Sequence, residues 1–246
     1  MRKQSHLFRT VLKTLMGVFL AGLLLWTAVY GSEAGDRRKQ EERLQTSGDV
    51  INEVLNMPDS IPQSLLDRAK CVVVIPSVLK AAFIVGGTYG RGAMVCRSGE
   101  GYAGQWGAPV MMAVEGGSIG LQLGGEATDF VILIMNDRGA SSLLSSKVKI
   151  GGDISAAAGP VGRTAEADTD AYMRAEMLTY SRARGLFAGI SLEGTTLRPE
   201  AEADEALYGR KIEAREIVRG PDPKAPEAAA RLISRLDQAS PIRKGE

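Results

Sequence analysis

Histidine is almost missing from this chain, because His6 is the single histidine among its 246 residues. A serine nucleophile of the usual hydrolase type needs an imidazole base to take its proton, and imidazole is one of the main zinc ligands. Cysteine is also scarce, with Cys71 and Cys96 as the only two. These shortages leave neither the ligands for a zinc site nor the base for a hydrolase. We therefore expect no metal and no cofactor.

The chain also lacks an excess of charge of either sign. Beyond residue 34 it has 26 basic and 28 acidic side chains, a net charge of −2. A nucleic-acid-binding protein normally shows a strong basic excess, so nucleic acid is not an expected partner. Any attraction to a membrane surface has to come from a local basic patch.

The first 34 residues have the pattern of an export signal. Residues 1–13 contain four basic side chains and no acidic one, an apolar run covers 15–30, and small residues follow at Ser32 and Ala34. This order is typical of a secretory signal peptide cleaved after about Ala34. The run is long for such a signal and shorter than the roughly 20 apolar residues of a spanning helix, so an uncleaved membrane anchor is the competing interpretation. In either case we expect an exported protein of the periplasm or cell envelope.

The two cysteines leave two interpretations open. In an oxidising compartment Cys71 and Cys96 can form a disulfide, which for a loop of this length would stabilise the protein by about 3–4 kcal/mol in the chain-entropy model. The alternative is a pair of buried thiols that behave as small apolar side chains. Sequence alone does not test the geometry that a disulfide requires.

Glycine is the residue type in clear excess, with 29 residues, about 12% against roughly 7% in an average protein. Glycine within strands permits bends, bulges and close approach of neighbouring backbones. The pattern between about 81 and 197 is one of short strands interrupted by glycine, and we expect Pro76 to end the strand before it and Gly48 to weaken the first helix. We expect an α+β fold with a glycine-rich, mainly antiparallel curled sheet or barrel-like core and flanking short helices. The expected helices are 37–57, 63–69, 140–145, 200–208, 211–219 and 227–238, and the expected strands include 71–75, 93–97, 110–114, 118–123, 129–135, 147–150 and a hairpin within 170–192.

Two glycine motifs resemble catalytic or cofactor signatures without their context. Gly99, Gly101 and Gly104 match a dinucleotide fingerprint, but a helix must follow that motif and the residues after Gly104 do not favour one, so we interpret it as a hairpin turn. Ser118 lies in a Gly-x-Ser-x-Gly sequence, the pattern of a nucleophile elbow, but it has no histidine base. We expect no enzymatic activity, because the acid–base groups that catalysis by Ser118 or by a carboxylate pair requires are missing.

Several blocks in order along the chain resemble the SYLF-domain family, which includes the fungal-type actin-binding domain that also binds lipid. The resemblance runs over about 41–220, and several blocks in register are far more specific than any one of them. The blocks are 69–76 (AKCVVVIP), 83–92 (FIVGGTYGRG), 106–109 (WGAP), 117–125 (GSIGLQLGG), 128–129 (TD), 158–163 (AGPVGR) and 180–194 (YSRARGLFAGISLEG).

This resemblance implies a non-enzymatic domain that binds phospholipid, with phosphoinositides as ligands of the eukaryotic members and actin as a partner of the fungal ones. An exported chain would not meet actin, so the partner that we expect is the anionic phospholipid surface of the cell envelope. The expected contacts are basic side chains on lipid phosphates and shallow insertion of the apolar face of an amphipathic N-terminal helix, here 37–57. The candidate lipid-binding residues are Arg37, Arg38, Lys39 and Arg43, followed by Arg91, Arg163, Arg182 and Arg184.

The expected organisation is a signal peptide or membrane anchor over 1–34, a SYLF-like domain over 35–220, and a proline-rich linker with a C-terminal amphipathic helix over 221–246. An alternative function is that of an envelope structural or scaffolding module. Such a module would bind a protein partner through helix 227–238 or through a sheet edge.

Overall fold

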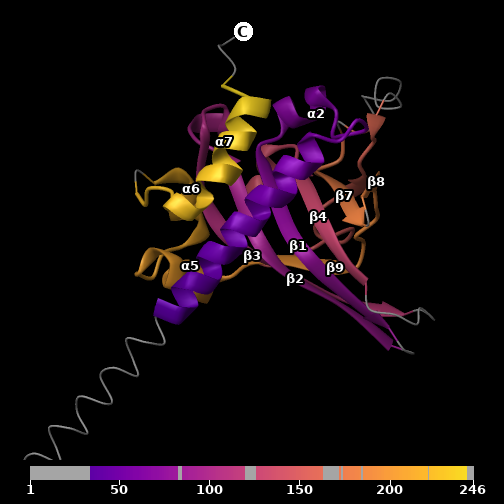
Figure 1. The fold of residues 1–246 in the computed structure, drawn as a ribbon, viewed down its shortest axis with the longest axis horizontal. Coiled ribbons are helices and arrows are strands. Elements are labelled where there is room, and N and C mark those ends of the chain that lie inside the picture. Colours follow the sequence, from indigo (N-terminus) through magenta and orange to yellow (C-terminus); the bar gives the residue numbers. More distant parts are fainter. Residues whose placement is uncertain are drawn as a thin grey trace, which may run out of the picture.

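A curled nine-stranded sheet forms the centre of the protein (Figure 1). The computed structural model describes residues 34–82, 85–119, 126–162, 172, 174–183, 185–220 and 222–242. Strands follow the order β5-β9-β3-β2-β1-β4-β7-β6, with β8 beside β7, and the pairs between strands are antiparallel apart from β6 with β7. The strands are β1 (Cys71–Ala82), β2 (Val85–Arg97), β3 (Trp106–Ile119), β4 (Glu126–Ile134), β5 (Val148–Lys149), β6 (Ala156–Ala158), β7 (Met177–Ala183), β8 (Leu186–Gly189) and β9 (Thr195–Pro199).

Helices cover both faces of this sheet, which confirms the predicted α+β fold. Four helices pack on one face: the N-terminal helix (residues 34–55), α2 (Gln63–Arg68), α5 (Ala201–Tyr208) and α7 (Ala230–Ala239). The other face is covered by α3 (Asp137–Ser145) and α6 (Ala214–Arg219). Because strand side chains alternate between the two faces, β1 contributes Val72 and Val74 to the first core and Val73 and Ile75 to the second.

The N-terminal helix, which we expected over 37–57, covers residues 34–55 and crosses the sheet diagonally (Figure 1). Its apolar side chains Leu44, Ile51 and Val54 are fully buried. The helix is unbroken at Gly48, the residue that we expected to weaken it. A Cβ at Gly48 would lie 3.0 Å from the backbone nitrogen of Leu232 on α7, so glycine here permits close packing of two helices, which outweighs its poor helix propensity.

The expected end of the first strand at Pro76 was also wrong, because β1 continues through a bulge. Val74 pairs with Ala93 and Leu79 with Tyr89, so β1 has one residue more than β2 between these pairs. Ser77 adopts a φ of 49° and donates its backbone N–H to Asp129 Oδ1 at 2.9 Å. Proline lacks this donor and is tolerated inside a sheet at such bulges. Because the extra residue reverses the alternation of side chains, Leu79 lies on the face that carries the N-terminal helix.

Glycine does not divide the sheet into short strands, contrary to our expectation. β2 runs unbroken through four glycines, at positions 86, 87, 90 and 92, and β3 runs through three, at 107, 116 and 117. The hairpin predicted at Gly99–Gly104 is present, since this segment connects β2 to β3 and contains a short 3-10 turn.

Cys71 and Cys96 form a disulfide in this structure. They lie directly opposite each other on β1 and β2, and both side chains are buried. The bond links the start of one central strand to the end of the next.

The C-terminal helix α7 is part of the core. Leu232 and Leu236 are almost completely buried against the N-terminal helix and the sheet. The apolar face of this helix, which we had considered as a docking surface for a protein partner, is therefore occupied within the domain. None of the helices among the described residues has the length and apolar character needed to cross a membrane.

Candidate functional site

The first turns of the N-terminal helix present three of the predicted lipid-binding side chains to solvent. The side chains of Arg37, Arg38 and Lys39 are 55%, 78% and 65% exposed. Each is paired within the helix, with Glu41, Glu42 and Asp36 respectively. Exposed pairs of this spacing contribute only about 0.3–0.5 kcal/mol, so another anion can compete for these cations.

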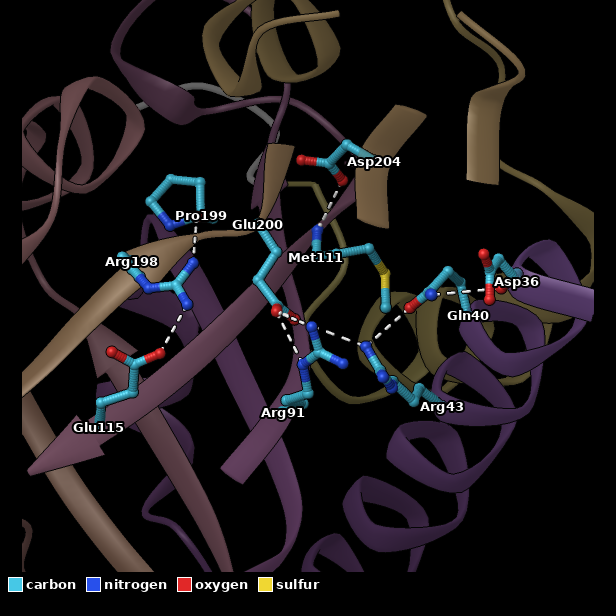
Figure 2. Close-up of polar contacts among 10 residues, drawn as sticks. All are labelled: Asp36, Gln40, Arg43, Arg91, Met111, Glu115, Arg198, Pro199, Glu200 and Asp204. Atoms are coloured by element: carbon cyan, nitrogen blue, oxygen red, sulfur yellow. Dashed lines mark hydrogen bonds and ion pairs between the residues drawn. The ribbon is translucent and has the colours of Figure 1, made fainter. Parts of the chain in front are cut away.

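Two further predicted residues, Arg43 and Arg91, converge on one buried carboxylate (Figure 2). Glu200 lies immediately before α5, and its side chain is 4% exposed. Arg91 Nε donates to Glu200 Oε1 at 2.7 Å, and an Nη atom of Arg43 lies 3.5 Å from Oε2. Burial lowers the pKa of Arg43, and the neighbouring Arg91 lowers it further. These two arginines therefore hold the N-terminal helix and β2 to the start of α5.

Three more charged residues surround these three, and we call the six together the Glu200 cluster: Arg43, Arg91, Glu115, Arg198, Glu200 and Asp204 (Figure 2). Arg198 pairs with Glu115 at 2.5 Å, and this hydrogen bond raises the pKa of Arg198. Asp204 accepts the backbone N–H of Met111 at 2.8 Å, which caps β3 where β9 leaves its edge. Oδ2 of Asp204 is buried and has no hydrogen-bond partner in the described part of the chain.

Burial raises the pKa of Asp204 from 3.8 to about 8, and the nearby carboxylate of Glu200 adds to the shift. At neutral pH Asp204 is therefore mainly protonated. The formal charges of three arginines and two glutamates then give the Glu200 cluster one net positive charge.

We expect the substitution Asp204→Asn to change how stability depends on pH. The folded state holds the Asp204 proton up to pH of about 8, whereas the unfolded state loses it near 3.8, so the wild-type protein loses stability as pH rises between these values. Asparagine keeps an acceptor for Met111 and has no proton to lose. The free energy of unfolding of the variant relative to wild type, measured in urea from pH 4 to pH 9, should rise by a few kcal/mol and level off above pH 8. A difference that does not vary with pH would contradict the assignment.

The remaining predicted residues do not join these two groups. Arg182 on β7 pairs with Asp129 and with Glu53, near the end of the N-terminal helix. Since a helix rises 1.5 Å per residue, Glu53 lies about 24 Å along the helix from Arg37. Arg163 and Arg184 fall outside the described residues, as do residues 1–33 with the expected signal or anchor. The predicted set is thus divided among the helix start, the Glu200 cluster and a separate site at β7.

Sequence reasoning missed the acidic half of the Glu200 cluster. Glu200 and Asp204 lie in a polar, alanine-rich stretch that resembles any solvated helix start. Their burial depends on the register of β9 against β3, which places Pro199 opposite Met112. The available signal was that backbone N–H groups at the edge of β3 need acceptors. This need can be recognised only once the register of β9 against β3 is known.

The described residues contain no group of three or more side chains suited to hold a metal ion. Their prominent polar features are paired charges on the sheet and its covering helices.

Comparison with known proteins agrees with this description. The Ysc84 family model, described as a Las17-binding protein actin regulator, matches residues 115–239. The chain belongs to this family, which is the SYLF-domain family that the sequence resembled.

Three relatives illustrate the relationship. Protein YSC84 of Saccharomyces cerevisiae is 35% identical over 189 residues, covering 76% of this chain and 39% of the yeast protein. LAS seventeen-binding protein 3 of the same species is 38% identical over 173 residues, covering 69% of this chain and 37% of that protein. The human SH3 domain-containing YSC84-like protein 1 is 35% identical over 184 residues, covering 74% of this chain and 52% of that protein. The chain thus spans about two fifths to one half of the length of these relatives.

Proposed function

We propose that this protein is a non-enzymatic domain of the cell envelope that binds anionic phospholipid through the basic start of its N-terminal helix. The observation that carries the proposal is the exposure of Arg37, Arg38 and Lys39 on consecutive positions of a helix that the rest of the domain holds in place. The apolar run 15–30 precedes these residues in the sequence. Whether this run is a signal or an anchor, it directs the chain to a membrane. If the run is retained, the basic residues follow it closely, where each contributes about 1 kcal/mol of attraction to an anionic surface.

The burial of the helix argues against the insertion of its apolar face. Leu44, Ile51 and Val54 have no exposed surface, and each such side chain contributes about 1.5–3 kcal/mol when buried. Releasing them to a bilayer would also uncover the facing side of the sheet. The combined cost is comparable with the whole stability of a typical domain, about 5–15 kcal/mol. We therefore propose lipid binding by charge at the outer face of a docked helix, in place of the amphipathic insertion that the sequence suggested.

The test is co-sedimentation of residues 35–246 with vesicles of graded phosphatidylglycerol content at low and high salt. Replacing Arg37, Arg38 and Lys39 with glutamine should weaken binding at low salt about tenfold or more, since each lost phosphate contact removes attraction of about 1 kcal/mol. Arg43 is left unchanged in this variant because it holds Glu200.

A matched control changes the net charge equally at another place. Arg138, Lys147 and Lys149 are exposed cations at α3 and β5, and their replacement with glutamine should leave vesicle binding nearly intact. Equal losses of binding in both variants would mean that binding depends on net charge alone, and would contradict the proposed binding surface. Absence of binding for the wild-type protein at every composition would refute lipid binding itself.

The names of the relatives support a second candidate, a module that binds a protein. One relative is by its name a binding protein for Las17, and the family model is described as an actin regulator. For this chain the candidate predicts a specific partner whose binding is independent of lipid. Co-sedimentation with actin filaments, run beside the vesicle assay, separates the two: pelleting with filaments and not with vesicles would favour the second candidate.

A further inference from the structure

The central strands extend beyond their neighbours at one end of the sheet. β9 pairs with β3 as far as Gly116, and β7 pairs with β4 only from Asp129 onward. Parts of four strands continue past these limits, and we call them together the free sheet end. They are residues 78–82 of β1, 85–90 of β2, 117–119 of β3 and 126–128 of β4. Figure 1 shows this end projecting away from the covering helices, toward the lower right of the view.

The free sheet end carries exposed apolar side chains on the face that holds the N-terminal helix. Leu79 is 57% exposed and Tyr89 is 46% exposed. They are direct partners across β1 and β2, and the bulge at Ser77 places Leu79 on this face. Leu186, which is 77% exposed, lies on the adjoining β7–β8 hairpin, one pair beyond the level of Asp129. Three of the four exposed large apolar residues among those described are therefore at this end of the protein.

Charge is sparse at this end, where the two charged residues Lys80 and Glu126 have opposite signs and are paired across β1 and β4. Net positive charge lies just behind it. The sequence has no charged residue in 81–90 or in 116–125. Arg91 follows Tyr89 by two positions on the same face of β2 and belongs to the Glu200 cluster, which has one net positive charge at neutral pH. An anionic membrane has an apolar interior, an interface at which tyrosine concentrates, and a negatively charged surface. The apolar end, the tyrosine at its margin and the cations behind it follow the same order.

The geometry of the whole molecule favours the same occupant. In Figure 1 the first turn of the N-terminal helix lies at the lower left and the free sheet end at the lower right. One plane along this side of the molecule can therefore touch both. A second copy of the chain fits less well, because the open edges at 117–119 and 126–128 offer three described residues each, whereas a typical strand pairs over about 5–6.

We propose that the free sheet end is a second membrane-contact surface, which rests on the headgroup region of an anionic phospholipid bilayer with Leu79 and Tyr89. This inference builds on the proposed lipid binding and adds the orientation of the domain: the helix start and the free sheet end contact the same bilayer. Contact is confined to the interfacial region, because the open strand edges carry backbone groups that the hydrocarbon interior would leave without partners.

The experiment places an environment-sensitive fluorophore at single positions of the full chain reconstituted in phosphatidylcholine vesicles with or without phosphatidylglycerol. The labelled variants are Tyr89→Cys for the free sheet end, Lys39→Cys for the helix start, and Gln238→Cys as a control at the opposite end of the molecule, with the native disulfide intact. With anionic vesicles, labels at 89 and 39 should shift their emission to shorter wavelength and lose severalfold in quenching by aqueous iodide. The label at 238 should show neither change.

Each outcome decides between the two proposals. A response at 39 without one at 89 would overturn the role of the free sheet end and leave lipid binding by the helix in place. A response at 89 that grows with the amount of protein per vesicle and needs no phosphatidylglycerol would show contact between copies of the chain, and would overturn the inference. No response at either position would refute both proposals.

Discussion

Replacing Gly92 with alanine is expected to reduce the free energy of unfolding by about 3–5 kcal/mol, a large part of the stability of an ordinary domain. A Cβ at this position would lie 2.0 Å from the carbonyl oxygen of Val74 and 2.7 Å from the Cα of Ile75. Both atoms belong to the backbone of β1 next to the bulge, so no side chain can rotate to relieve the overlap. The central strands β1 and β2 would have to move apart at this point of the sheet. Urea denaturation followed by circular dichroism measures the loss.

Gly87 provides the control on the same strand. A Cβ there would find its nearest neighbour, the carbonyl oxygen of Gly116, at 3.9 Å. Gly87→Ala should therefore be neutral or stabilising by up to about 1 kcal/mol, because alanine restricts the unfolded chain more than glycine does. If the two substitutions have equal effects, the close approach at Gly92 is not what makes glycine necessary there.

Substituting Arg97 with methionine is expected to have the second largest effect. Arg97 is 2% exposed, and its guanidinium donates to the carbonyl oxygens of Ala69, Gly104 and Ser240. It also stacks 4.3 Å from the centre of the Trp106 ring, whose Nε1 donates to the same Ser240 oxygen. Methionine fills much of the volume but leaves these buried acceptors short of donors, which costs about 1–3 kcal/mol for each group left unsatisfied.

We therefore expect the free energy of unfolding to fall by roughly 3 kcal/mol in Arg97→Met. The loss should be accompanied by faster hydrogen exchange in α7, since Ser240 ends that helix. Arg38→Met, at a side chain that is 78% exposed, is the matched control and should change neither quantity by much. Unaltered exchange in α7 would mean that Arg97 does not hold the C-terminal helix.

The helices were predictable because their signals are local. Leu44, Ile51 and Val54 recur at helical spacing, and the first helix ends close to Pro58 as expected. Strand lengths were not predictable, because the continuation of β1 through Pro76 depends on Asp129 of another strand, which holds the bulge. The continuation of β2 through its glycines likewise depends on partner strands on both sides.

The candidate site divides in the same way. Its helical half, Arg37 to Lys39, follows from the order of residues along one segment. Its other half depends on contacts between distant segments: Glu200 meets Arg43 across 157 positions and Arg91 across 109. A buried carboxylate that joins such segments has no local sequence signal, since acidic residues are normally exposed.

The packing of α7 against the N-terminal helix also bears on when the chain can fold. Gly48 lies close against Leu232, and Arg97 binds Ser240, so the core on this face closes only after residues 230–240 have been synthesised. Contacts of such long sequence separation form late and slow the folding of a chain. A nascent chain that lacks α7 therefore leaves this face of the sheet uncovered, and translation itself sets the earliest moment at which the domain can close.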